Sequence, residues 1–297
     1  MFRKIISYTL YPVLLTSIIL IIIAAIHYRW DYKLTYGLTT LGLILILMFF
    51  EFMLPLSTDW KMTGKSFLRD LKYIIVDAPL IALTKSAFGF FAIYYSENHK
   101  GFFSDSPMII SVIGFLVVYE FFQYWYHRLS HNSKGKWGKF LWGVHLAHHL
   151  PDKVYVVMHA VFNPINAIIM AIIVQTPLVL LGISPEAALA ATLIIDLQSM
   201  ISHFNAEIRA GFLNYIFIGA ETHRYHHSAN MNESKNYGNT LAIWDIVFGT
   251  FLYMPGKAPE KLGVEGQEDY PSSNNIFKVI SYPFRKSTKY SLDKSFK

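Results

Sequence analysis

Long apolar runs constrain the fold of this chain more than any other feature. A helix needs about 20 apolar residues to cross the hydrocarbon core of a bilayer. The runs that approach or exceed this length are 5–26, 36–55, 73–95, 108–124 and 160–183. A further run, 187–200, follows after a Gly182-Ile183-Ser184-Pro185 turn, which predicts a helical hairpin. We therefore expect an all-α integral membrane protein with about four N-terminal transmembrane helices and a helical hairpin.

The placement of Lys and Arg predicts the orientation in the membrane, because short cytoplasmic loops are rich in these residues. Arg3 and Lys4 precede the first run, and the loop 57–72 is also basic. We therefore expect a multi-pass protein whose N-terminus, whose chain after Met200 and whose C-terminus are cytoplasmic, in a bacterial inner membrane or the endoplasmic reticulum. A cleaved signal peptide is the alternative for the first run, but its apolar region is typically only ~7 to 15 residues.

Composition excludes several classes of site. The chain has no cysteine, which rules out disulfides, iron–sulfur clusters and zinc–thiolate sites. It also lacks the glycine-rich motifs of nicotinamide, flavin and nucleotide sites. The net charge of +6 fits anionic lipid headgroups better than nucleic acid, because no basic, aromatic-studded binding module is present.

Histidines are concentrated in one third of the chain. Ten of the twelve lie between His127 and His227, and eight of these form three clusters, which we call histidine boxes. The first box is His127 and His131, the second is His145, His148 and His149, and the third is His223, His226 and His227. Residues three and four apart share one face of a helix, and imidazole is a ligand for iron, zinc and copper. The boxes therefore predict a metal site.

The number of histidines indicates two metal ions. One ion ordinarily takes about four to six ligands, and the box histidines together with His159 and His203 exceed that number. His27 and His99 fall on the opposite side of the membrane in this topology, so we expect them to be interfacial.

Carboxylates are absent from the boxes. A zinc protease needs H-E-x-x-H, but Arg128 follows the first histidine here, and the Glu-x-x-His motif of soluble di-iron carboxylate proteins is also missing. Glu120 and Asp196 stand two turns before His127 and His203 on the same helical faces. They are candidate acceptors for histidine N–H groups, or polar contacts between helices.

The surroundings of the boxes form recognisable motifs. They are E-F-F-Q-Y-W-Y-H-R at 120–128 with His131, H-L-A-H-H at 145–149 and H-R-Y-H-H at 223–227, supported by N-Y-G-N at 236–239, W-D at 244–245 and F-G-T at 248–250. Over roughly 115–253 the chain resembles the fatty acid hydroxylase/sterol desaturase superfamily. The gap of three residues in the first box is similar to this superfamily, whereas acyl-CoA desaturases typically have four. The chain departs from the family at His159-Ala160, where His-Pro is common.

The resemblance implies a cofactor, partners and a domain plan. It implies two iron ions, with zinc possible in purified samples, O2 as co-substrate, and an external electron donor of the cytochrome b5 or ferredoxin/reductase type. We expect an N-terminal transmembrane region at 1–106, the catalytic domain with a cytoplasmic helical cap at 107–255, and a basic cytoplasmic tail at 256–297. The expected metal ligands are His127, His131, His145, His148, His149, His159, His203, His223, His226 and His227, with Glu120, Asp196, Asn239 and Asp245 around them.

The expected reaction is oxidation of a lipid C–H bond. No side chain attacks such a bond, so the metal centre and O2 must carry the difficult step. Hydroxylation is our preference, with desaturation as the alternative. The remaining alternatives are a non-catalytic member that only binds a sterol or another lipid, and a metal transporter.

Basic residues at Lys134, Lys136 and Lys139 are a candidate docking surface for an acidic electron donor. Basic residues from Lys278 to the C-terminus suit contact with the membrane, although a solvated tail explains them equally well.

Overall fold

The computed structural model describes residues 1–285, and this part of the chain is helical without a β-strand. The long helices are α1 (Phe2–His27), α2 (Tyr32–Met53), α3 (Gly64–Asn98), α4 (Met108–Asn132), α6 (Pro164–Leu180) and α7 (Pro185–Ser202). The shorter ones are α5 (Gly135–His149), α8 (Ala220–His226), α9 (Ile243–Val247) and α10 (Ile276–Ile280), with the 3-10 turns η1 (Val156–Ala160), η2 (Gly211–Tyr215), η3 (Gln267–Asp269) and η4 (Tyr282–Phe284). The expected all-α fold is confirmed.

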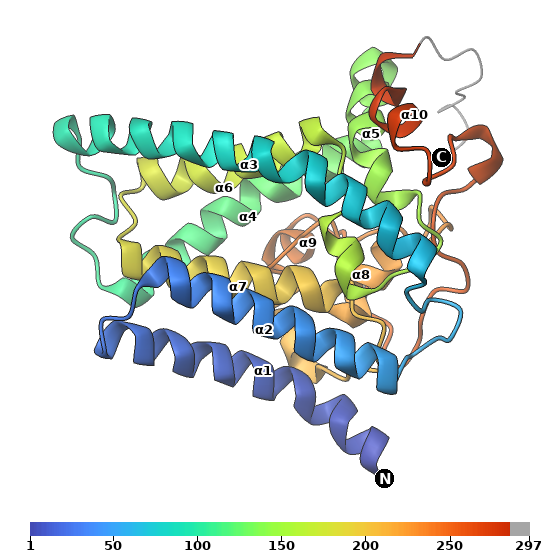
Figure 1. The fold of residues 1–297 in the computed structure, drawn as a ribbon, viewed down its shortest axis with the longest axis horizontal. Coiled ribbons are helices and arrows are strands. Elements are labelled where there is room, and N and C mark those ends of the chain that lie inside the picture. Colours follow the sequence, from blue (N-terminus) through green and yellow to red (C-terminus); the bar gives the residue numbers. More distant parts are fainter. Residues whose placement is uncertain (286–297) are drawn as a thin grey trace.

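The long helices form a layered bundle. In Figure 1, α3 and α6 lie side by side in one layer, and α7 lies with α2 and α1 in the other. Helix α4 crosses between the layers and packs against both α6 and α7. The short helices gather at the end of the bundle where α4 finishes, so the chain following the apolar spans folds at one end.

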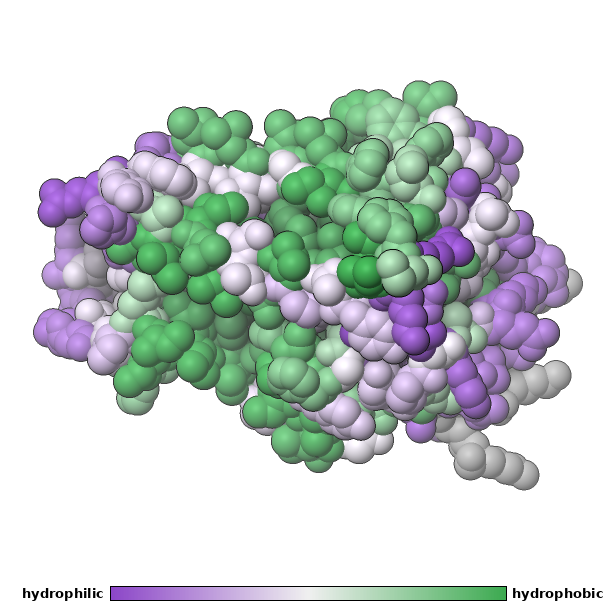
Figure 2. All heavy atoms as spheres, turned by 90° about the horizontal axis from the view of Figure 1, so that it is seen from below, coloured by the Kyte–Doolittle hydropathy of each residue, from purple (hydrophilic) through white to green (hydrophobic). Residues whose placement is uncertain are grey.

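Among the described residues 1–285, four helices, α1 to α4, are long and apolar enough to cross a bilayer. Apolar side chains cover the middle of the molecule while hydrophilic ones gather at both ends (Figure 2). The helices extend beyond the apolar runs: α3 begins at Gly64, and α4 continues, as expected, through the first histidine box to Asn132. The expected helical hairpin is present as α6 and α7, but its first helix is shorter than the run 160–183, because Asn163 caps a helix that begins only at Pro164 and has 17 residues.

The two ends of the bundle are held by different contacts. At one end, Phe103 N donates to Leu181 O (2.7 Å), which joins the α3–α4 loop to the α6–α7 turn. Gly182 in this turn has φ +67° and packs closely against the loop, so only glycine fits there. At the other end, Leu56 N donates to Asn205 O (3.0 Å). The α2–α3 loop therefore lies at the same end as the segment that follows α7.

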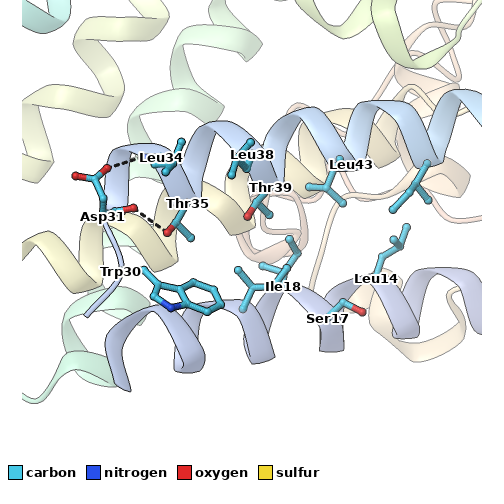
Figure 3. Close-up of a pocket in the computed structure, with 13 residues that line it drawn as sticks. Leu14, Ser17, Ile18, Trp30, Asp31, Leu34, Thr35, Leu38, Thr39 and Leu43 are labelled. Atoms are coloured by element: carbon cyan, nitrogen blue, oxygen red, sulfur yellow. Dashed lines mark hydrogen bonds between the residues drawn. The ribbon is translucent and has the colours of Figure 1, made fainter. Parts of the chain in front are cut away.

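An apolar groove of about 530 Å³ runs between α1 and α2. Figure 3 shows Leu14 and Ile18 of α1 opposite Leu38 and Leu43 of α2, with Asp31 capping α2 through Leu34 N (2.7 Å). Apolar grooves on the outer face of a membrane bundle are filled by acyl chains of the bilayer, so the shape of this groove alone assigns it no specific ligand.

Part of the segment expected as a basic tail is folded. Leu262, Val264 and Val279 are buried in an apolar cluster with residues of α3, α5 and η1. The described part of this segment therefore covers one side of α5. The basic residues expected to contact the membrane beyond Arg285, namely Lys286, Lys289, Lys294 and Lys297, lie outside the described residues.

This arrangement predicts which loops share one side of the membrane. The chain has no cysteine, so single cysteines can be introduced at the exposed positions Thr58, Lys134 and Glu97. We expect a membrane-impermeant maleimide to label Glu97→Cys in intact spheroplasts, and Thr58→Cys and Lys134→Cys only in inside-out vesicles. Labelling of Thr58→Cys and Lys134→Cys from opposite sides would contradict the bundle.

Candidate metal centre

Nine histidines form two buried groups at the end of the bundle. The first group is His127, His131, His145, His149 and His226, and the second is His148, His203, His223 and His227. Within each group the candidate ligand atoms all lie within 4.8 Å of one another. The structure thus brings together all eight box histidines and His203.

Each triple box contributes to both groups. In α5, His145 and His149 belong to the first group, whereas His148 between them belongs to the second. At α8 the pattern is reversed, because His223 and His227 face the second group and His226 the first. Residues three and four apart lie on the same broad face of a helix, but consecutive residues such as His148 and His149, or His226 and His227, point about 100° apart. Helices α5 and α8 therefore each reach both groups.

Burial keeps these histidines neutral. All nine side chains are at most 7% exposed. Loss of hydration lowers the pKa of His203 to about 3, and it lowers the pKa of His148 and His226 well below the usual value. Neutral imidazole is the form that binds a metal ion, so no proton has to leave before binding at neutral pH.

Backbone carbonyls fix the outer nitrogens of several rings. Nδ1 of His127 lies 2.7 Å from Tyr237 O, Nδ1 of His203 lies 2.9 Å from Ser199 O, and Nδ1 of His226 lies 3.0 Å from Lys235 O. Nδ1 of His148 is 3.3 Å from Val161 O. A carbonyl oxygen only accepts, so Nδ1 must carry the proton and Nε2 of the neutral ring presents a lone pair to the group.

The inner nitrogens are too close for a set of mutual hydrogen bonds. Nε2 of His203 lies 3.2 Å from Nε2 of both His223 and His227, which are 3.1 Å from each other. Each nitrogen is either a donor or an acceptor, so two of any three have the same role and repel. His148 and His203 meet at 3.1 Å although both present lone pairs.

A metal ion removes this conflict, because it accepts a lone pair from every nitrogen. A metal–nitrogen bond of about 2.1 Å separates neighbouring ligand nitrogens by about 3.0 Å at a right angle and about 3.4 Å at the tetrahedral angle. The Nε2 contacts in the first group, 2.9 Å for His127–His145 and for His149–His145 and 3.1 Å for His226–His149, are close to the right-angle value. The residues of both groups therefore fit metal ions.

Two of the expected surrounding residues hold one loop beside the first group, and a third, Asn239, lies in that loop. Asp245 accepts from Tyr237 N (2.8 Å) and Gly238 N (2.7 Å), and so fixes the peptide whose carbonyl accepts the hydrogen bond from His127 Nδ1. Glu120 of α4 accepts from Asn239 N (2.6 Å) and from the next two backbone N–H groups. Glu120 thus ties the 237–241 loop to α4, and Asp245 ties it to α9.

Two expected residues have other contacts. His159 lies outside both groups, and its Nδ1 donates to Val156 O (2.6 Å) within η1. Asp196 faces α2 and accepts from Thr40 Oγ1 (2.9 Å). We therefore leave both out of the proposed centre. His27 and His99 end α1 and α3 at the far end of the bundle, as expected for interfacial residues.

The sequence reasoning missed two positioning residues. Asn166 on α6 accepts from Tyr126 Oη (2.6 Å) and faces His145 Nδ1 at 3.4 Å. The buried Arg224 lies inside the third box and donates to Phe204 O, which fixes the segment after His203. A polar amide in an otherwise apolar helix was a signal for Asn166. The role of Arg224 depends on a backbone carbonyl, which no sequence pattern reveals.

Comparisons with known proteins agree with this centre. The fatty acid hydroxylase family model matches residues 112–250. Among curated relatives, ornithine lipid hydroxylase OlsE of Rhizobium tropici is 28% identical over 81% of this chain and 72% of its own. Human alkylglycerol monooxygenase is 32% identical over 54% of this chain and 34% of its own, and rat methylsterol monooxygenase 1 is 26% identical over 60% and 58%. No solved structure matches.

The apolar helices, the boxes and these matches support a membrane oxygenase. Residues 112–250 match the fatty acid hydroxylase family, and the similar proteins are named as hydroxylases and monooxygenases.

The separation into two groups predicts independent loss of metal. We expect about two metal ions per chain in the anaerobically purified protein, and about one after His131→Ala or His203→Ala, because each change removes a ligand from one group only. The double variant should hold none. Elemental analysis measures this, with His99→Ala as the control. Loss of both ions in either single variant would contradict two separable sites.

The contact of Asp245 with the 237–241 loop predicts an effect at a distance. Asp245→Ala frees the Tyr237 peptide that orients His127, and removal of such supporting groups typically weakens metal affinity by about 10- to 100-fold. Chelator competition should detect weaker binding of one ion only. Asp245→Asn keeps one accepting oxygen and should be milder, and the exposed Asp59→Asn is the matched control. Unchanged affinity in Asp245→Ala would show that the loop is held without this carboxylate.

Proposed function

We propose that this chain is a membrane oxygenase that hydroxylates a C–H bond of a lipid, using two histidine-bound iron ions, O2 and electrons from a separate donor protein. The observation that carries the proposal is the pair of buried histidine groups at one end of an apolar bundle. Similarity to an ornithine lipid hydroxylase over 81% of the chain supports the reaction type.

The proposed ligands are the nine histidines of the two groups, with the 237–241 loop and Asn166 as positioning elements. When bound, two irons supply the reductive activation of O2 that oxidation of an unactivated C–H bond requires. Zinc also binds imidazole, so the redox task is the argument for iron. The protein itself keeps the rings neutral, accepts hydrogen bonds from Nδ1–H of four of them at backbone carbonyl oxygens, and excludes water from the groups.

The lipid substrate follows from the place of the centre. The first group lies partly on α4, which is itself a candidate membrane span. A lipid can therefore keep its chains in the bilayer while one carbon reaches the metal centre. The matched relatives are named as hydroxylases and monooxygenases, which favours hydroxylation over desaturation. We place the N-terminus, the boxes and the C-terminus in the cytoplasm, and the catalytic domain at 107–255.

The electron donor has a plausible approach along α5. Lys134, Lys136 and Lys139 are exposed around the start of this helix, and His145 lies six residues after Lys139. A rise of about 1.5 Å per residue makes that separation about 9 Å along the helix. An acidic cytochrome b5 or ferredoxin docked here comes close to the histidines of the second box.

The alternative functions fit the geometry less well. A transporter keeps its ionisable residues along a path through the membrane, whereas the histidine groups lie at one end of the bundle. A lipid-binding protein without catalysis needs no complete ligand set, whereas both groups here are complete enough to hold an ion.

Isotope labelling tests the proposal. The iron-loaded protein is mixed with a reductase, NADPH, a cytochrome b5 or ferredoxin, and a lipid mixture that includes ornithine lipid, under O2 enriched in its heavy isotope. We expect a lipid product heavier by one oxygen atom that carries the isotope, and none with the His148→Ala, His226→Ala double variant. A product that has lost two hydrogens would show that the reaction is desaturation and not hydroxylation. If no donor and no lipid gave a product, the proposal that the chain is an enzyme would be refuted.

A further inference from the structure

A polar cavity of about 500 Å³ lies beside the start of α3, separate from the histidine groups. Its walls come from residues 63–69, from Asp152 and Lys153, and from the segment 267–274. Ligand sites ordinarily have volumes of about 300 to 1,000 Å³, so this cavity is large enough for a lipid headgroup. We call it the headgroup cavity.

Arg69, which is paired with the buried Asp70, supplies a fixed hydrogen-bond donor to one part of the headgroup cavity. Arg69 is only 9% exposed, and its guanidinium is fixed by Nε to Asp70 Oδ1 (2.7 Å) and by Nη2 to Tyr155 Oη (2.7 Å). Nη1 makes only a long contact of 3.4 Å, with Ser273 Oγ, so it remains the donor for a ligand. A guanidinium held in this way suits a carboxylate or phosphate, and Lys65 lines the same cavity.

Charges of both signs surround the rest of the cavity. Lys65 and Lys153 face it together with Asp152 and Glu268. None of these four side chains has an ion-pair partner among residues 1–285. A purely anionic ligand would be repelled by the two carboxylates, whereas an ammonium group would be attracted to them. The cavity therefore suits a zwitterion.

The position of the cavity indicates that the zwitterion belongs to a lipid. The α3 wall is the first turn of a candidate membrane span, and Phe67 and Leu68 beside it are 40% and 58% exposed. The opposite wall includes Asp152, three residues after His149 in the chain. Gln267, which also lines the cavity, donates from Nε2 to Leu150 O (3.0 Å). A headgroup held here lies between the apolar surface and the segment that leaves the metal centre.

We propose that the headgroup cavity binds the zwitterionic headgroup of the lipid substrate, with an anionic group at Arg69, Lys65 and Lys153 and an ammonium group at Asp152 and Glu268. That this lipid is the substrate rests on the proposed function. Binding of a zwitterionic lipid does not depend on it.

Lipid binding is measured on the full-length, metal-loaded protein in detergent by native mass spectrometry. We expect dioleoylphosphatidylethanolamine to bind about tenfold more tightly than uncharged dioleoylglycerol. It should also bind more tightly than anionic dioleoylphosphatidylglycerol and than glycerophosphoethanolamine, which has no chains. The Lys65→Ala, Lys153→Ala variant should lose the preference. The Lys134→Ala, Lys136→Ala variant, with the same change in charge outside the cavity, should keep it.

Three binding results would overturn the proposal. If the wild type bound all the lipids equally, the cavity would not be a headgroup site. If it bound the anionic lipid as tightly as the zwitterion, Asp152 and Glu268 would not bind an ammonium group. Glycerophosphoethanolamine binding as tightly as the lipid would mean that the cavity holds a soluble zwitterion.

Kinetics then test whether the bound lipid is the substrate. With the lipid that the isotope experiment identifies, Lys65→Ala, Lys153→Ala should raise KM about tenfold, leaving kcat and metal content unchanged. Lost binding with an unchanged KM would refute the substrate assignment. Preserved lipid binding by a wild type that has no oxygenase activity would refute the proposed function and not the cavity.

Discussion

The structure depends on the direction of the lone pairs of nine buried imidazoles. Carbonyl oxygens accept hydrogen bonds from Nδ1–H of His127, His148, His203 and His226, and this leaves the Nε2 lone pairs of these rings facing other nitrogens. Without an ion this arrangement is repulsive, and with one it becomes favourable. Under the proposed function, metal binding and folding of this end of the bundle are coupled, because an ion stabilises only the arrangement in which α4, α5, α7 and α8 meet.

The carboxylates act one step away from the histidines. Asp245 and Glu120 bind backbone N–H groups of the 237–241 loop, and that loop presents the carbonyl that orients His127. A carboxylate placed directly on the ring would add negative charge beside the metal ion, whereas a carbonyl oxygen fixes the tautomer and remains neutral. The chain thereby keeps all-imidazole groups and uses buried hydrogen bonds between backbone N–H groups and carboxyl oxygens to hold them.

The proposed centre lies between three environments. The apolar surface of α3 and α4 leads into the bilayer, the headgroup cavity opens beside the start of α3, and the lysines around the start of α5 face water. Lipid, headgroup and electron donor can thus approach from different directions without competing. Helix α5 connects the water-facing lysines to the proposed centre, because its first turn carries exposed lysines and its last turn carries histidines of both groups.

The sequence by itself determined the apolar spans and the histidine boxes, because both are local patterns: apolar length decides whether a helix can span a bilayer, and spacing decides which side chains share a helical face. It also indicated His203 and Asp245. Only the tertiary structure divided each triple box between two groups, placed His159 and Asp196 outside them and packed the segment after 256 against α5. The reason is physical: which lone pairs converge on one point depends on where α5, α7 and α8 cross, and the spacing along one helix carries no information about its neighbours.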